Sequence, residues 1–150
     1  MVDSEPSHRM DVLLVEDNED DVAVAQRLLS RSGALISLHV CRDGEEALQF
    51  LYERRDQDDA RLPDLVLLDL RLPTVDGIEV LRRMKADRKL HTIPVVVLTG
   101  LAVEEQLWMC LELGTHMFLT KPLAIEDVMN VVIGVRRHRT AIDRLSRPGA

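Results

Sequence analysis

Short apolar runs alternate along the chain with segments in which apolar residues recur every three or four positions. The first pattern is typical of strands and the second of amphipathic helices. Their regular alternation predicts βαβ units built around a parallel sheet. The expected strands are five runs, at residues 12–15, 35–40, 65–68, 95–98 and 117–119, and the last helix is expected to continue to about Leu145.

Three of these runs, residues 12–15, 65–68 and 95–98, are apolar at every position. A strand covered by helices on both faces has this composition, so we expect these three in the middle of the sheet. The run at residues 35–40 alternates apolar and polar residues and the run at 117–119 is short, which favours the two edges. Because crossovers between parallel strands are right-handed, the sequence predicts an α/β, doubly wound sheet.

Composition fits a single globular domain. The chain has 150 residues, of which 46% are hydrophobic and 30% charged, and no apolar run is long enough to cross a bilayer. The first ten residues contain no apolar signal segment, so a cytoplasmic location is expected. A formal net charge of −7 disfavours direct binding to nucleic acid. Cys41 and Cys110 lack the spacing of zinc or disulfide sites and are expected to pack internally.

Polar residues follow four of the five expected strands. They are Glu16 and Asp17 after the first, Asp69 after the third, Thr99 after the fourth, and Lys121 with Pro122 after the fifth. The carboxyl ends of parallel strands meet at the crevice where doubly wound proteins bind ligands, so these residues are expected in one pocket. Glu19, Asp20 and Asp21 are expected only to favour the start of the next helix.

Carboxylates that converge without a counter-charge repel one another, so this pocket requires a cation. Oxygen ligands favour Mg²⁺, for which Mn²⁺ can substitute. Lys121 adds a positive charge that can hold a phosphoryl group. The expected chemistry is phosphoryl transfer to a carboxylate, and Asp69 is the preferred acceptor because it ends the most apolar strand.

Four segments, in this order, resemble the response-regulator receiver domains of bacterial two-component signalling. They are LLVEDN at 13–18, DLVLLDLRLPTVDG at 64–77, VVVLTG at 95–100 and FLTKP at 118–122. The resemblance covers about residues 11–136 and implies a flavodoxin-like (βα)5 sheet of strand order 2-1-3-4-5 with a helical C-terminal extension. LLVEDN, PVVVLTG at 94–100 and the long loop before the third strand resemble the Rcp-like single-domain regulators that pair with bacterial phytochromes.

Carried over by motif, the resemblance implies that a partner sensor histidine kinase, such as a bacteriophytochrome, phosphorylates Asp69 in an Mg²⁺-dependent reaction. The implied metal ligands are Glu16, Asp17, Asp69 and the main-chain carbonyl of Arg71. Thr99 and Lys121 match the residues that contact the phosphoryl group, Thr99 and Phe118 match the switch residues, and Pro122 matches the proline of a cis peptide bond. The surface of the fourth helix, fifth strand and fifth helix is expected to change shape in response.

The expected organisation is a flexible N-terminus at residues 1–10, a receiver domain at 11–137 and a basic, partly disordered extension of the last helix at 138–150. Residues 134–150 hold five arginines and one aspartate, a net charge of +4 that leaves −11 for the rest. The chain is expected to signal by binding or by passing the phosphate onward. Beyond its own phosphorylation and dephosphorylation, no enzyme activity is expected.

The fourth helix is apolar around most of its circumference, and Trp108 shares a stripe with two glutamates, so Trp108 is expected to face away from the sheet. Apolar residues of the last helix recur at coiled-coil spacing. We therefore expect a homodimer, with no membrane contact, whose interface contains Trp108, Met109, Leu113, Val131, Val135, Ile142 and Leu145.

Other functions remain open. A phosphate-independent adaptor, or pseudo-receiver, is one alternative, and a flavin carrier is another, although no phosphate loop suited to flavin follows the first strand. An aspartyl-phosphate phosphohydrolase is disfavoured, because the haloacid-dehalogenase pattern needs an acid two residues after the nucleophile and Arg71 stands there.

Overall fold

A computed structural model of the chain describes residues 9–57, 60–100, 104–115 and 117–146, with only the helix backbone given for residues 139–146. Within these ranges five parallel strands form one sheet of order β2-β1-β3-β4-β5. The strands are β1 (Met10–Val15), β2 (Ile36–Cys41), β3 (Leu65–Asp69), β4 (Val95–Thr99) and β5 (Met117–Thr120). The predicted flavodoxin-like fold is confirmed, including the edge positions of the second and fifth strands.

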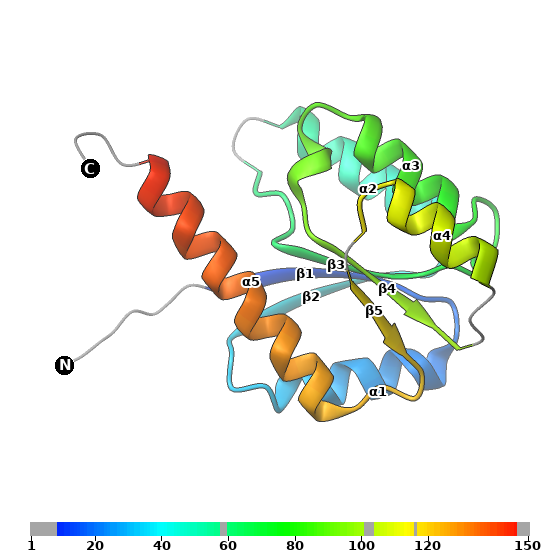
Figure 1. Cartoon of the computed structure of the whole chain (residues 1–150), viewed down its shortest axis with the longest axis horizontal. Helices are drawn as coiled ribbons and strands as arrows, with labels where there is room; N and C mark the ends of the chain where they lie inside the picture. Colours follow the sequence, from blue (N-terminus) through cyan, green and yellow to red (C-terminus); the bar gives the residue numbers. More distant parts are fainter. Residues whose placement is uncertain (1–8, 58–59, 101–103, 116, 147–150) are drawn as a thin grey trace.

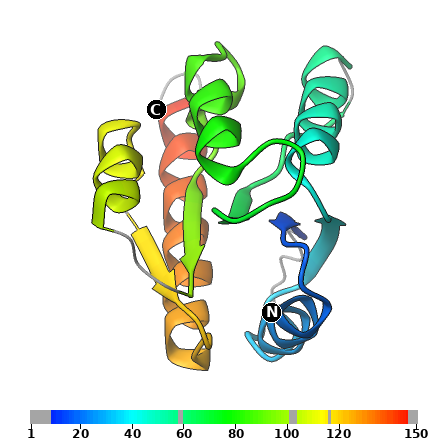
Figure 2. The ribbon, with the colours of Figure 1, turned by 90° about the vertical axis from the view of Figure 1, so that its right-hand side faces the viewer.

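Helices cover both faces of the sheet (Figures 1 and 2). They are α1 (Glu19–Ser30), α2 (Gly44–Asp56), α3 (Gly77–Ala86), α4 (Glu104–Glu112) and α5 (Ile125–Ser146), with a 3-10 turn, η1 (Leu90–Thr92), before β4. Alternate residues of a strand point to opposite faces. On β3, Val66 and Leu68 pack with α2 and α3, whereas Leu65 and Leu67 pack with α1 and α5. Burial on both faces explains why the central strands are apolar throughout.

The two ends of the described chain differ from each other. Strand β1 begins at Met10, which is buried and donates its backbone N–H to the carbonyl of Leu35 at 2.8 Å. The expectation that residue 10 belongs to a flexible N-terminus is therefore wrong, because it is the first rung of the sheet. Helix α5 packs on the sheet at its start, and its last turns project beyond the body of the domain (Figure 1). No helix in the described ranges combines the length and hydropathy needed to cross a bilayer.

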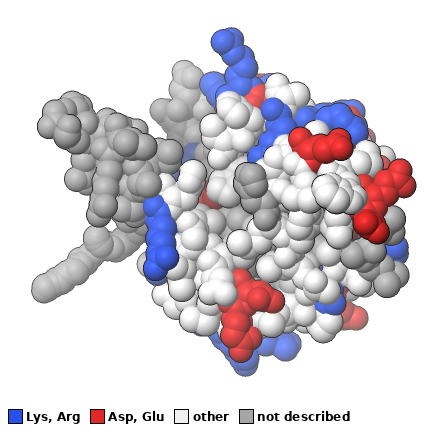
Figure 3. Space-filling model, in the orientation of Figure 1, with Lys and Arg blue, Asp and Glu red and all other residues white. Residues whose placement is uncertain are grey.

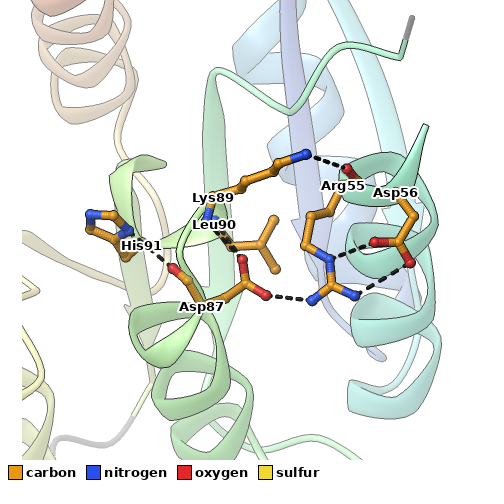
Figure 4. Close-up of polar contacts among 6 residues, drawn as sticks. All are labelled: Arg55, Asp56, Asp87, Lys89, Leu90 and His91. Carbon is orange, nitrogen blue, oxygen red and sulfur yellow. Dashed lines mark hydrogen bonds and ion pairs between the residues drawn. The ribbon is translucent and has the colours of Figure 1, made fainter. Parts of the chain in front are cut away.

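A cluster of ion pairs joins the end of α2 to the segment after α3 (Figure 4). Asp87 accepts backbone N–H groups of Lys89 and Leu90 at 2.9 and 3.0 Å through one oxygen, and binds Arg55 through the other. Arg55 also donates to Asp56 at 2.8 Å, and the Lys89 ammonium donates to the carbonyl of Arg55 at 3.3 Å. Each carboxylate in this cluster faces a cation, so the cluster fixes α2 against η1.

Candidate functional site

A cavity of about 450 Å³ opens at the carboxyl end of the sheet. Residues from the ends of four strands line it, among them Glu16, Asp17, Asp69, Thr99 and Lys121. These residues span 105 positions of the sequence, from 16 to 121. The structure thus brings together the side chains that were predicted to share one pocket.

Local structure fixes Asp69 at the floor of this cavity. It is the last residue of β3 and is paired in register with Leu98 of β4. The loop after it turns sharply, so that the backbone N–H of Arg71 donates to Asp69 Oδ1 at 2.9 Å and that of Gly77 donates to the carbonyl of Leu70 at 3.0 Å. A Cβ at Gly77 would collide with the backbone carbonyl of Asp69, so this close approach requires glycine.

Three carboxylates, those of Glu16, Asp17 and Asp69, present oxygen atoms within 4.8 Å of one another. Burial raises the pKa of Glu16 to about 7, and the nearby Asp69 carboxylate raises it as well, although the hydrogen bond from Lys121 lowers it. Burial is the largest cause of this rise, and it makes the ionised form of Glu16 unfavourable unless a cation lies close to it. An all-oxygen set of this kind fits a hard divalent cation.

The side chain of Lys121 carries a positive charge into this group of carboxylates. Its Nζ atom donates to Glu16 Oε1 at 2.5 Å, to Asp69 Oδ2 at 2.7 Å and to Asp21 Oδ2 at 2.9 Å. Burial lowers the pKa of Lys121, but the hydrogen bonds to the carboxylates outweigh burial, and the pKa lies above its ordinary value. The ammonium therefore stays charged. The peptide bond between Lys121 and Pro122 is cis.

The contact between Lys121 and Asp21 corrects the expectation that Asp21 only favours the start of α1. Asn18 caps this helix by accepting the backbone N–H of Asp21 at 3.0 Å, which leaves the Asp21 side chain free to reach the cavity. Asp21 lies in the first turn of α1 and lines the cavity, where its carboxylate contacts Lys121. No signal in the run of acidic residues at positions 19–21 distinguishes Asp21 from its neighbours.

The remaining predicted site residues are distributed differently. Thr99, the last residue of β4, is buried and lines the cavity, as does Arg71. Phe118 on β5 is half-buried and packs against the apolar cluster beneath α2, α3 and α4. The roles of Thr99 and Phe118 in switching, and of the Arg71 carbonyl in metal binding, stay predictions.

The predicted dimer interface is partly wrong. Val131 and Val135 are buried in the core between α5 and the sheet, so neither is available on the surface. Trp108 is 59% exposed and faces away from the sheet as expected, while Met109 and Leu113 are half-buried against the core. The side chains of Ile142 and Leu145 lie outside the described part of the structure. On α4, β5 and α5, the other large apolar side chains that are exposed in the described part of the chain are Leu111, Met117, Met129 and Ile133, and Leu35 before β2 is exposed as well.

Comparison with protein families gives one match along most of the chain. Residues 12–133 match the model of the response regulator receiver domain. The chain belongs to the response regulator receiver family. The acidic pair after β1, the aspartate that ends β3, the hydroxyl residue that ends β4 and the lysine after β5 therefore stand in a receiver fold, in the order that the sequence motifs indicated.

Individual receivers are similar to this chain over nearly all of its folded part. Response regulator Rcp1 of Synechocystis is 38% identical over 124 residues, which cover 83% of this chain and 84% of that relative. The solved structure of its Mn²⁺-bound form has a TM-score of 0.70 at 37% identity and covers 84% of this chain and 91% of that one.

Two further receivers are similar to a comparable degree. The phosphorylated cyanobacterial phytochrome response regulator RcpA has a TM-score of 0.72 at 35% identity, covering 85% of this chain and 91% of that one. The probable methanogenesis regulatory protein FilR2 of Methanothrix harundinacea is 38% identical over 138 residues, 91% of this chain and 88% of that relative. Receivers of more than one signalling context therefore resemble this chain.

Proposed function

We propose that this receiver accepts, in the cytoplasm, a phosphoryl group onto Asp69 from a phosphohistidine of a partner sensor kinase. One observation carries the proposal: the buried Asp69 carboxylate lies at the floor of a solvent-open cavity with Glu16, Asp17 and the Lys121 ammonium around it. A bacteriophytochrome is our candidate kinase, because a phytochrome response regulator is among the similar structures. The chain also matches most of the length of Rcp1, which favours a stand-alone regulator.

In the proposed transfer, a carboxylate oxygen of Asp69 forms a bond to phosphorus while the bond from phosphorus to the imidazole nitrogen breaks. The electron pair of the broken bond stays on the imidazole, which takes a proton from solvent. Lys121 holds Asp69 in place at 2.7 Å and offers its positive charge to the phosphoryl oxygens. The Asp69 oxygen that receives the Arg71 N–H is held by the backbone, so the carboxylate keeps one orientation.

The carboxylates of Glu16, Asp17 and Asp69 would hold Mg²⁺, for which Mn²⁺ can substitute, and the main-chain carbonyl of Arg71 would complete the set. When bound, the ion neutralises negative charge that gathers during transfer. The Thr99 hydroxyl lines the same cavity and would donate to a phosphoryl oxygen. Movement of Thr99 and of Phe118 would then pass the change to the surface of α4, β5 and α5.

That surface suits a binding role. The exposed apolar side chains of Trp108, Leu111, Met117, Met129 and Ile133 all belong to α4, β5 and α5. The face of the molecule over β5 has few charged side chains, and those visible lie mostly toward the rim of that face (Figure 3). We propose a homodimer through this surface, with these five residues in the interface in place of the buried Val131 and Val135.

The proposal is tested by incubating the protein with acetyl phosphate and Mg²⁺ and measuring intact mass. The wild type should gain the mass of one phosphoryl group, and Asp69→Asn should gain none. Asp127→Asn, which changes an exposed aspartate of α5, is the matched control and should behave as the wild type. A phosphoryl group on Asp69→Asn, or none on the wild type, would contradict the proposal.

Sedimentation of the same samples tests the homodimer separately. Phosphorylated wild type should sediment as a dimer at micromolar concentration, and Asp69→Asn should show a smaller dimeric fraction. A monomeric mass for the phosphorylated wild type would exclude the dimer while leaving the phosphorylation result intact.

A further inference from the structure

Asp21 differs from the other two carboxylates that contact Lys121. Glu16 and Asp69 both belong to the trio that fits a divalent cation, whereas Asp21 does not. Its side chain is 39% exposed, against 1% for Glu16 and 10% for Asp69. Asp21 therefore contacts the ammonium from the solvent side of the cavity, while its two companions contact it from within.

An ammonium group has three N–H donors. In the structure all three carboxylate contacts of Lys121 lie at hydrogen-bond distance, so the donors are fully used. A divalent cation held by Glu16, Asp17 and Asp69 would neutralise part of the negative charge of Glu16 and Asp69. Asp21 would keep its full charge and would compete with the phosphoryl group for the Lys121 ammonium. A phosphoryl group on Asp69 brings about two further negative charges. Its oxygens must then draw the ammonium away from Asp21.

We propose that Asp21 is a positioning residue that holds the Lys121 ammonium toward the mouth of the cavity and thereby weakens the hold of Lys121 on a phosphoryl group at Asp69. The inference rests on the proposed function, and adds to it a residue that limits the stability of the phosphorylated form. Asp21 acts through Lys121 and takes no part in the transfer itself.

The first turn of α1 offers a matched control. Asp20 precedes Asp21, is exposed and carries the same charge, yet no hydrogen bond or ion pair joins it to Lys121 in the described part of the chain. Asp20→Asn and Asp21→Asn therefore make the same change in net charge and nearly the same change at the helix N-terminus. Only Asp21→Asn removes a charge that touches the lysine.

The test uses beryllofluoride, a noncovalent analogue of the phosphoryl group, titrated into the full chain in Mg²⁺ by calorimetry. Asp21→Asn should bind beryllofluoride about threefold more tightly than the wild type, the size expected for a half-exposed ion pair. Asp20→Asn should match the wild type. In a Lys121→Gln background the effect of Asp21→Asn should disappear, since the two residues act as one unit.

Each result decides the matter. Equal affinities for Asp21→Asn and Asp20→Asn would overturn the role of Asp21, as would an Asp21→Asn effect that persists in the Lys121→Gln background. Both results leave the proposed function standing if the wild type binds beryllofluoride and Asp69→Asn does not. A wild type that fails to bind beryllofluoride in Mg²⁺ would overturn the proposed function and this inference together. A Mg²⁺ titration alone, with equal affinities for the two aspartate variants, confirms that the effect does not pass through the metal.

Discussion

Two clusters of ion pairs tie distant parts of this chain together, and they are built in opposite ways. One surrounds Lys121 at the carboxyl edge of the sheet, and the other joins α2 to η1 through Arg55 and Asp87 (Figure 4). Four carboxylates line the cavity of the first cluster against two basic residues, Lys121 and the exposed Arg71. In the second cluster both carboxylates, those of Asp56 and Asp87, bind Arg55, and the Lys89 ammonium donates to the backbone carbonyl of Arg55.

The pKa values follow this difference. Burial and the neighbouring Asp69 raise the pKa of Glu16 to about 7, although Lys121 opposes the rise. Burial also acts to raise the pKa of Asp87, but Arg55 and two backbone N–H groups lower it below its ordinary value. The cluster around Lys121 has more carboxylates than basic groups and can bind a further cation or a proton, as a reactive site must. The cluster around Arg55 has equal numbers of both and stabilises the contact between α2 and the segment after α3.

We expect the largest effect from the loss of the Lys121 ammonium. Lys121→Gln leaves Glu16 and Asp69 buried beside one another without their ammonium. Breaking a buried pair from one side costs about 3 kcal/mol. Urea unfolding at pH 8 with a chelator should show a loss of that order, and added Mg²⁺ should recover part of it because the ion binds only the folded state.

Lys89→Gln is the corresponding change in the second cluster, where the exposed ammonium donates to the backbone carbonyl of Arg55 at 3.3 Å. It should leave the urea midpoint unchanged, with or without Mg²⁺. If Lys121→Gln and Lys89→Gln lowered the urea midpoint equally, the first cluster would depend on its lysine no more than the second cluster does.

The raised pKa of Glu16 makes the stability of the folded state depend on pH. Because the pKa of Glu16 is raised in the folded state, that state binds a proton more tightly than the unfolded chain, whose glutamates titrate near 4.5. The contribution of Glu16 to the stability of the metal-free wild type should therefore fall as pH rises from about 4.5 to about 7, and level off above. Glu16→Gln cannot titrate, so it should gain stability relative to the wild type over that range, on the order of 2 kcal/mol at pH 8.

Urea midpoints between pH 4.5 and 8 in chelator measure this gain. Glu126→Gln, which removes an exposed charge from the first turn of α5, serves as the control and should run parallel to the wild type at every pH. A constant offset between Glu16→Gln and the wild type across this range would refute the link to Glu16 titration.

The same two clusters mark what sequence can and cannot predict. Strand order and the meeting of Asp17, Asp69 and Lys121 follow from apolar runs and from the rule that parallel strands end together. Nothing in the sequence relates Arg55 to Asp87, since their contact depends on how two helices approach across 32 positions. Asp21 was missed for a related reason: the acid-rich start of a helix gives no indication of which carboxylate turns toward the sheet.

Helix α5 gives a second example of a feature that the sequence alone does not predict. A spacing of four and three residues suits both a coiled contact with a partner and an inward face against a sheet. The structure places Val131 and Val135 inward and leaves Met129 and Ile133 exposed, so the periodic positions serve the core. Only the position of α5 over the sheet decides between a partner contact and a core contact. The spacing of apolar residues in the sequence does not reveal that position.

The smallest expected effect belongs to the balanced cluster. Asp87→Ala removes an acceptor for two backbone N–H groups as well as the partner of Arg55, and should cost about 1 to 2 kcal/mol. Asp87→Asn keeps an oxygen for the backbone and should cost less. Because the pKa of Asp87 is lowered, its contribution is present above about pH 4 and is lost as pH falls through the lowered value.

Urea midpoints should therefore show the gap between Asp87→Ala and the wild type narrowing below about pH 4. Asp127→Asn, at an exposed aspartate of α5 outside this cluster, should leave the midpoint unchanged. A gap that stays constant into acid would mean that Asp87 acts only as a neutral cap. With Glu16 the stability is lost on the alkaline side, and with Asp87 on the acid side. Opposite slopes from two carboxylates in one fold would show that burial outweighs the hydrogen bond from Lys121 at Glu16, whereas the hydrogen bonds from Arg55 and the backbone outweigh burial at Asp87.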